Sequence, residues 1–249
     1  MLNYTRHGQG KTLVLVHGFL GGTAYWVPLT TGLKHAHDVI AVDLPGFAGS
    51  AQVPAPDSLS GYAKVVLALL DSLGVQRFSL LGFSMGGMIA QQAALDFPQR
   101  IDKLILYGSA AVGDLPHRFE SWEASIDRIE REGVEPTADK TVATWFVDGK
   151  SHPFYPACRE ACHGAYASSC VIVMRAMQQW NNVGKLGEIK MPTLVIVGDK
   201  DRSTKVSDSI ILWKGIPGAE LCVLPGCAHG AHMEKPDLFN KVLADFLAQ

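Results

Sequence analysis

The length, composition and charge of the chain exclude several classes of protein. With 249 residues it suits one large domain or two small ones, and it can bury a core without a metal or disulfide bridges. A hydrophobic fraction of 47% excludes a disordered chain, and a formal net charge of −2 lacks the basic excess typical of nucleic-acid-binding proteins. We therefore expect a globular protein without a nucleic-acid partner.

The sequence also contains indications of where the protein works. No apolar run approaches the roughly 20 residues of a membrane-spanning helix, and residues 1–7 do not resemble a signal peptide. The five cysteines are odd in number, which favours reduced thiols. These features predict a cytoplasmic protein with no membrane partner. They are compatible with a monomer and with a homo-oligomer.

Six short apolar runs, rich in β-branched residues, alternate with helix-length segments. The runs span residues 12–17, 38–43, 77–82, 103–107, 193–197 and 219–224. Unbroken apolar runs are typical of parallel strands that helices cover on both faces. Helical spacing over residues 62–73, followed by Gly74, and over residues 236–247, opened by Pro236, completes the pattern. The sequence predicts an α/β fold with a mostly parallel sheet and helices on both faces.

One long segment, residues 114–187, interrupts this alternation. Helical patterns fill it, and its one strand-like run, residues 170–174, fits a strand or a helix. Because so long an excursion between two strands is rarely a plain loop, we expect a helical insertion here. Residues 1–113 and 188–249 would then form the core of the fold.

The clearest chemical motif is the segment from Gly82 to Gly87, which reads Gly-Phe-Ser-Met-Gly-Gly. It follows a predicted buried strand and precedes a helical run. A sharp turn from strand to helix needs glycines beside the central residue, and it holds the Ser84 hydroxyl out at the carboxyl edge of the sheet. The motif predicts that Ser84 is a nucleophile.

A serine hydroxyl needs a base to take its proton, and that base needs a carboxylate to orient it. After the sixth predicted strand the chain offers His229 and His232, and after the fifth it offers Asp199 and Asp201. Spacing alone leaves all four pairings open.

Backbone N–H donors are also needed for the negative charge that develops on a carbonyl oxygen under attack. The segment from His17 to Gly22 follows the first predicted strand, and its glycines let the backbone turn inward. The N–H groups of Phe19 and Met85 are the candidate donors. The segment lacks the Gly-Lys-Ser/Thr ending of a phosphate-binding loop and the spacing of a dinucleotide fingerprint.

From end to end the chain resembles the α/β-hydrolase superfamily. The resemblance rests on the motifs just described and on two further segments, residues 43–50 (Asp-Leu-Pro-Gly-Phe-Ala-Gly-Ser) and residues 228–236 with their Glu-Lys-Pro ending. It implies Asp201 as the acid and His229 as the base, with Asp199 and His232 as second choices. It also implies that residues 114–187 form a helical cap over the pocket.

Within the superfamily, residues 69–75 and the size of the cap are similar to those of 3-oxoadipate enol-lactonases and related small esterases. The resemblance implies a serine hydrolase that cleaves a small carboxylic ester or lactone through an acyl-enzyme on Ser84. One alternative is hydrolysis of a carbon–carbon bond in a vinylogous diketone by the same three residues. The Leu20-Gly21-Gly22 sequence, where that branch often has Gly-Pro-Gly, counts against it. A receptor without enzymatic activity is the least favoured interpretation.

The remaining expectations concern the pocket and cofactors. Tyr25, Trp26, Trp145 and Met177 are candidates for lining the substrate pocket. The Cys158, Cys162 and His163 group has no second ligand pair near it in the sequence, and its spacing suits one face of a helix. We therefore expect neither a metal nor a cofactor.

Overall fold

A seven-stranded sheet forms the centre of the computed structural model, which describes residues 1–118 and 120–249. Its strand order is β1-β3-β2-β4-β5-β6-β7; β1 is antiparallel to β3, and the other neighbours are parallel. The strands are β1 (Tyr4–His7), β2 (Lys11–Val16), β3 (His37–Val42), β4 (Phe78–Phe83), β5 (Ile101–Tyr107), β6 (Thr193–Gly198) and β7 (Glu220–Leu224).

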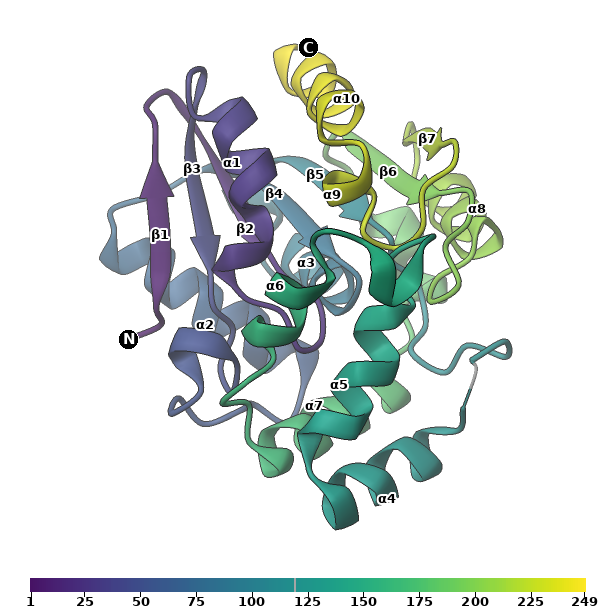
Figure 1. Ribbon diagram of the computed structural model, residues 1–249. Coiled ribbons are helices and arrows are strands. Elements are labelled where there is room, and N and C mark those ends of the chain that lie inside the picture. Colours follow the sequence, from purple (N-terminus) through teal and green to yellow (C-terminus); the bar gives the residue numbers. More distant parts are fainter. Residues whose placement is uncertain (119) are drawn as a thin grey trace.

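Helices cover both faces of this sheet (Figure 1). They are α1 (Val27–Leu33), α2 (Leu59–Ser72), α3 (Met85–Asp96), α4 (Trp122–Glu132), α5 (Val134–Ala143), α6 (Tyr155–Ala161), α7 (Ala167–Gln179), α8 (Val206–Gly215), α9 (Ala231–Glu234) and α10 (Pro236–Ala248). Alternate strand residues enter separate cores: Val14 and Val16 pack with α2 and α3, whereas Leu13 and Leu15 pack with α1 and α10. This two-sided burial explains the unbroken apolar runs.

The predicted fold class is confirmed, and each of the six apolar runs forms a strand. Sequence analysis missed β1, a short edge strand whose half-exposed polar residues give no apolar run. The ambiguous run at residues 170–174 is helical and belongs to α7. Helix α2 begins after Ser58, whose side chain accepts a hydrogen bond from the Gly61 N–H at 3.3 Å, and Gly74 follows its end with φ of +71°.

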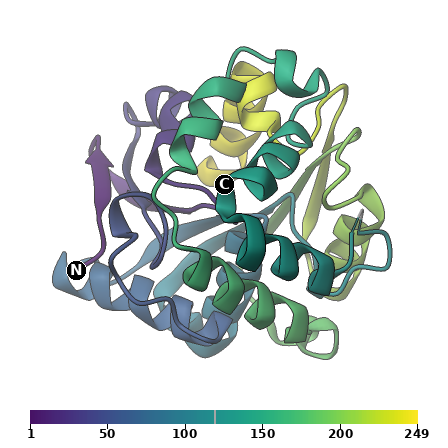
Figure 2. The same ribbon diagram turned by 60° about the horizontal axis from the view of Figure 1, so that its bottom comes forward.

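The helices between β5 and β6 form a group of their own. Figures 1 and 2 show α4 to α7, coloured teal to green, gathered in front of the sheet. Helix α4 packs against α5 and α7, and α6 packs against α5. The division of the chain at residues 114 and 187 stays a prediction.

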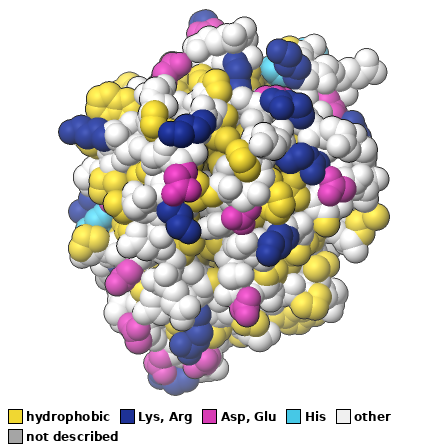
Figure 3. Space-filling view, turned by 180° about the vertical axis from the view of Figure 1, so that it is seen from behind, with side chains coloured by type: hydrophobic (Ala, Val, Ile, Leu, Met, Phe, Trp, Pro, Cys, Tyr) yellow, Lys and Arg dark blue, Asp and Glu magenta, His cyan; other side chains and the backbone are white. Residues whose placement is uncertain are grey.

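The surface carries both signs of charge. On the face shown in Figure 3, Lys and Arg side chains are interspersed with Asp and Glu. None of the helices in the described residues combines the length and apolar character needed to cross a membrane. Likewise, no group of three or more His, Cys, Asp and Glu residues within 1–118 and 120–249 is arranged to hold a metal ion.

Candidate active site

Four segments that follow parallel strands bring the predicted site residues to one edge of the sheet. Phe19 follows β2, Ser84 follows β4, Asp201 follows β6 and His229 follows β7. All four strands are parallel neighbours or near neighbours, so their carboxyl ends lie at the same edge. This is the edge at which open α/β sheets bind their ligands.

The backbone at Ser84 is strained in the way that its motif predicts. Its φ is +55° and its ψ is −118°, between the last residue of β4 and the first residue of α3. A Cβ at Gly82 would lie 2.2 Å from the Gly86 carbonyl oxygen, and a Cβ at Gly86 would lie 2.2 Å from the Val16 carbonyl oxygen. Glycine is therefore required at both positions for the strand and the helix to approach this closely.

His229 is paired with Asp201. Its Nδ1 donates to Asp201 Oδ2 at 2.7 Å, and both side chains are almost completely buried. The carboxylate also accepts the backbone N–H groups of Ser203, at 2.8 Å, and Thr204, at 3.0 Å. These bonds fix the carboxylate, which in turn fixes the ring so that Nε2 carries the free lone pair.

Asp199 has a structural role at the neighbouring turn. Its Oδ1 accepts the backbone N–H of Gly226 at 2.6 Å and that of Cys227 at 3.3 Å, and its Oδ2 lies 3.3 Å from Lys200 Nζ. Burial acts to raise the pKa of the carboxyl group, but the hydrogen bonds from Lys200, Gly226 and Cys227 outweigh it and lower this pKa. Asp199 thus holds the loop that leads to the imidazole and does not contact the ring itself.

His232 lies in the core below the site. Its Nε2 donates to the Tyr25 carbonyl at 3.0 Å, its Nδ1 lies 3.1 Å from the Tyr107 hydroxyl, and its ring lies against Trp26. Burial lowers its pKa to about 4, so the ring is neutral at neutral pH. The structure therefore brings together one of the four histidine–aspartate pairings, His229 with Asp201.

The loop that carries Phe19 is fastened from both sides. His17 Nδ1 donates to the Gly18 carbonyl at 2.7 Å, and His17 Nε2 accepts the Leu44 N–H at 2.9 Å. With one nitrogen donating and the other accepting, the ring is neutral, and burial lowers its pKa. A Cβ at Gly18 would lie 3.0 Å from the Ser84 Cβ, so this loop runs directly past the serine.

Leu20, in the same loop, has φ of +60°, a conformation that branched side chains rarely adopt. Its carbonyl accepts hydrogen bonds from the Tyr25 hydroxyl at 2.8 Å and from Cys162 Sγ at 3.4 Å. Cys162 therefore supports this loop, while the neighbouring His163 lies 2.8 Å from Glu135. The two side chains have separate partners.

A cavity of about 120 Å³ lies over Ser84. Phe19, Ser84, Met85 and His229 line it on the side of the sheet. In the described residues, no hydrogen bond joins the Ser84 hydroxyl to the His229 imidazole. Hydrogen bonds of this kind are often long before substrate binds, and the two groups face one cavity.

The other predicted pocket residues divide into two pairs. Trp145 and Met177, from the helical insertion, line the cavity. Tyr25 and Trp26 are buried and are not among the residues that line it. Tyr25 packs edge-on against Trp145, and Trp26 lies in the core against Phe83 of β4 and His232 of α9. Their apolar surface serves the core, which a pattern of aromatics near the loop could not distinguish from a pocket wall.

Sequence analysis missed the charged residues of this cavity. Arg118, Arg128 and Arg202 all contribute to its lining. An isolated arginine in a helical segment gives no local signal, because solvated arginines occur on most helices. Only the position of Arg202 directly after Asp201 could have drawn attention to it.

Comparison with known proteins identifies the fold and its relatives. The sequence model of the family described as alpha/beta hydrolase fold matches residues 11–143. A 2-hydroxy-6-oxononadienedioate/2-hydroxy-6-oxononatrienedioate hydrolase of Paraburkholderia phymatum is 33% identical, over 100% of this chain and 91% of that protein. The 3-oxoadipate enol-lactonase 2 of Acinetobacter baylyi is 28% identical, over 96% and 90%. The crystal structure of a hydrolase from Pseudomonas aeruginosa superimposes with a TM-score of 0.92 at 28% identity, over 100% and 94%.

Proposed function

Because the chain belongs to the α/β-hydrolase family and is a hydrolase, we propose that it cleaves a small carboxylic ester or lactone with Ser84, His229 and Asp201. One observation carries this proposal. The half-buried Ser84 and the imidazole of the buried His229–Asp201 pair line a single cavity at the carboxyl edge of the sheet. Those are the three groups that nucleophilic catalysis by a serine requires.

The first half of the reaction acylates the serine. His229 Nε2 takes the proton of the Ser84 hydroxyl while Ser84 Oγ attacks the carbonyl carbon of the substrate. Asp201 stabilises the imidazolium that forms and keeps the ring in the required orientation. The imidazolium then gives its proton to the leaving oxygen, and the bond between that oxygen and the acyl carbon breaks.

The Phe19 and Met85 N–H groups bind the oxygen that becomes negative in this step. Met85 is the first residue of α3, so its N–H has no partner within the helix, and the positive end of the helix dipole adds to its effect. Water then repeats the sequence on the acyl-enzyme and releases the acid. Apart from the substrate and water, the proposed residues supply every group that the two halves of the reaction need.

Hydrolysis of a carbon–carbon bond is the second candidate. It is favoured by the 33% identity to the Paraburkholderia hydrolase named above. The same three residues would act on a vinylogous diketone. Turnover of a coloured ring-cleavage dienoate at a kcat/KM far above that for simple esters would select this reaction over ester hydrolysis.

We also propose that the protein works in a reducing compartment. All five cysteines are free in the structure, which supports a reducing compartment such as the cytoplasm.

The test of the proposed function is Ser84→Ala, measured with a chromogenic short-chain ester. We expect kcat/KM to fall by at least about 10³-fold, because the nucleophile is gone. Ser60→Ala is the matched control and should keep full activity. Ser60 lies at the start of α2, and its hydroxyl donates a hydrogen bond to Asp96 at the end of α3. Full activity in Ser84→Ala would overturn the proposal.

A further inference from the structure

Among the described residues, every arginine, lysine, aspartate or glutamate that lines the cavity over Ser84 is an arginine. Within the described part of the chain its charged lining residues are Arg118, Arg128 and Arg202, and no Asp or Glu side chain lines it. Arg118 and Arg128 come from the segment between β5 and β6, opposite the sheet. A cavity of this kind raises the local concentration of anions. The three arginines differ, however, in the hydrogen-bond and ion-pair partners that their guanidinium groups already have within the protein.

Arg128 is fully engaged within the protein. Its two terminal nitrogens bind both carboxylate oxygens of Glu120, and its Nε donates to Thr137 Oγ1 at 3.0 Å. This pairing, together with Ser125, lowers the pKa of Glu120 to about 2. Arg128 therefore builds the wall of the cavity and carries little charge that is free to attract a ligand.

Arg202 is exposed at the rim. One of its terminal nitrogens donates to the Val147 carbonyl at 3.3 Å. Because water surrounds its guanidinium, an ion pair formed there would contribute little.

Arg118 is partly buried and has no carboxylate partner within residues 1–118 and 120–249. Its guanidinium lies over the Trp122 ring, 3.5 Å from the ring centre, and its Nε donates to the Glu120 carbonyl at 3.2 Å. Among the described residues no carboxylate lies within 4.0 Å of its nitrogens, and none accepts a hydrogen bond from its terminal nitrogens. Burial lowers its pKa, although the charges of Asp114, Glu120 and Glu123 partly offset the effect.

Of the three carboxylates whose charges act on Arg118, Asp114 is exposed and forms no ion pair with it in the described residues, and the other two are occupied elsewhere. Glu120 serves Arg128 and Ser125, and Glu123 accepts a hydrogen bond from Gln178 at 2.8 Å. A partly buried cation whose terminal nitrogens contact no carboxylate has donors left for a ligand.

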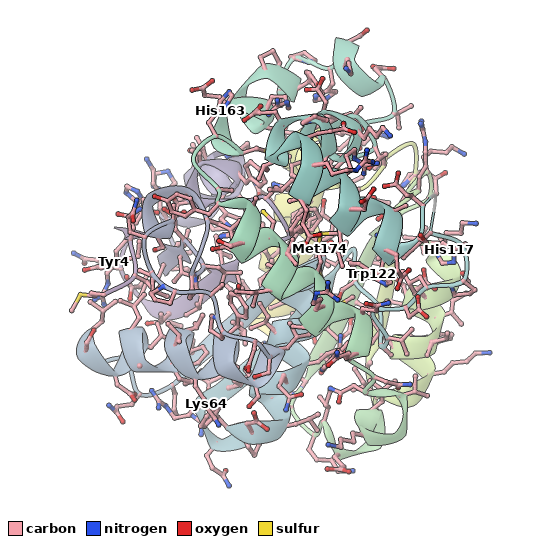
Figure 4. All side chains as sticks on the ribbon, turned by 90° about the horizontal axis from the view of Figure 1, so that it is seen from below. Tyr4, Lys64, His117, Trp122, His163 and Met174 are labelled. Atoms are coloured by element: carbon pink, nitrogen blue, oxygen red, sulfur yellow. The ribbon has the colours of Figure 1, made fainter. Side chains whose placement is uncertain are left out.

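The segment that carries Arg118 is held in place from the side of the sheet. Leu115 is buried, and His117 lies 3.1 Å from Asp208 of α8. Figure 4 shows Trp122 beside Met174, where α4 packs on α7, with His117 to the right of both. Stacking on Trp122 fixes the plane of the guanidinium and aims its donors, so little rotamer entropy is lost when an anion binds.

We propose that Arg118 binds a carboxylate of the substrate, so that the preferred ester or lactone is anionic and carries a free carboxylate under the helical insertion. This inference rests on the proposed function, because it assigns the other end of the same substrate. It makes Arg118 the specificity-determining residue, while Arg128 shapes the wall and Arg202 stays at the rim.

Matched pairs of esters test the assignment. The monoethyl esters of succinic, glutaric and adipic acids are compared with the corresponding diethyl esters, which are neutral. The native protein should favour one monoester over its diester, and the best chain length reports how far Arg118 lies from the scissile carbonyl. Arg118→Gln should lower this monoester-to-diester ratio of kcat/KM by roughly 10- to 100-fold, mostly through the KM of the monoester, and Arg118→Lys should restore part of it.

Two other arginines serve as controls. Arg175 lies on α7 outside the cavity, so Arg175→Gln should keep the native ratio. Arg202→Gln should change it only slightly. If Arg202→Gln abolished the preference and Arg118→Gln did not, the assignment to Arg118 would be wrong. A native ratio at or below one would also overturn it, and so would an unchanged ratio in Arg118→Gln. A lower melting temperature of Arg118→Gln with an unchanged ratio would assign the arginine to the fold alone.

Binding without turnover separates this proposal from the proposed function. Calorimetric titration of Ser84→Ala with the monoesters should give a Kd that rises roughly 10- to 100-fold when Arg118→Gln is added. If Ser84→Ala abolishes turnover but the added substitution leaves Kd unchanged, the carboxylate assignment fails and the serine hydrolase stands. If Ser84→Ala stays active while the Kd changes as expected, the carboxylate assignment stands and the serine hydrolase proposal fails.

Discussion

At Ser84, Leu20 and Ala48 the chain adopts positive φ angles of 55°, 60° and 43°, which residues other than glycine rarely adopt. Two of the three belong to segments that face the cavity, and Ala48 packs against Gly22 of the loop that carries Phe19. Each such residue costs on the order of 1–3 kcal/mol, which the surrounding contacts must offset. Strain at the level of single residues is therefore concentrated where the nucleophile and the proposed oxyanion donors are positioned.

Asp201 and Asp199 are a natural pair for a test at this scale, because they are two residues apart and have different partners. Asp201→Asn should lower kcat by roughly 10³- to 10⁴-fold, since the amide no longer holds His229 in the required tautomer. Asp199→Asn should keep kcat within a few-fold, because its partners are the Gly226 and Cys227 N–H groups. Steady-state kinetics on the chromogenic ester distinguishes the two variants, and equal losses would contradict the assignment.

At the scale of whole elements, hydrogen bonds connect the loop of His229 to the helical segment between β5 and β6. Glu234 accepts the Ala228 N–H at 2.6 Å and the Val147 N–H at 2.7 Å, and the Gly230 N–H donates to the Trp145 carbonyl at 2.6 Å. The imidazole and the wall of the cavity opposite the sheet are thus positioned by the same contacts. Movement of the insertion would therefore be transmitted to the proposed base.

The contact of α3 with β2 is as tight as backbone atoms allow, which makes Gly86 a test of element packing. In Gly86→Ala the new methyl would meet the Val16 carbonyl at 2.2 Å and the His17 carbonyl at 2.6 Å. We expect a loss of about 3 kcal/mol or more of unfolding free energy, measured by urea denaturation, because backbone has to move. Gly184→Ala, whose new methyl would have no atom within 4 Å among the described residues other than its chain neighbours, should change stability by less than about 1 kcal/mol. Comparable stabilities would contradict this packing.

For the whole molecule, the pH dependence of stability reflects the buried His232. It lies between the Tyr25 backbone, Tyr107 and Trp26, and burial lowers its pKa from 6.5 to about 4. Between these two pH values the unfolded chain binds the proton and the folded chain does not. The free energy of unfolding therefore falls as the pH drops from 6.5 to 4, by roughly 3 kcal/mol from this group.

Equilibrium denaturation of native protein and His232→Gln across pH 4 to 7 measures this contribution. The glutamine keeps a side chain that can hydrogen-bond and does not titrate, so the variant should lose part of the slope below pH 6.5. The remaining slope includes His17, whose pKa burial also lowers. Identical slopes in the two proteins would show that His232 takes up its proton equally in both states.

The sequence by itself determined the α/β sheet, its six parallel strands and the turn at Ser84. Those features depend on local patterns, namely unbroken apolar runs, helical spacing and glycines around one serine, and each is complete within about 15 residues. Likewise, the glycines directly after β2 were enough to predict a loop that turns inward, and Gly18 of this loop lies beside the serine.

Only the tertiary structure decided which aspartate meets which histidine, that Tyr25 and Trp26 belong to the core, and that Arg118 lines the cavity without an ion-pair partner in the described part of the chain. Each depends on contacts between segments far apart in the chain, such as Asp201 with His229 across two strand ends. The physical reason is that a side chain's charge and burial are set by the partners that folding brings to it, and no local pattern records those partners.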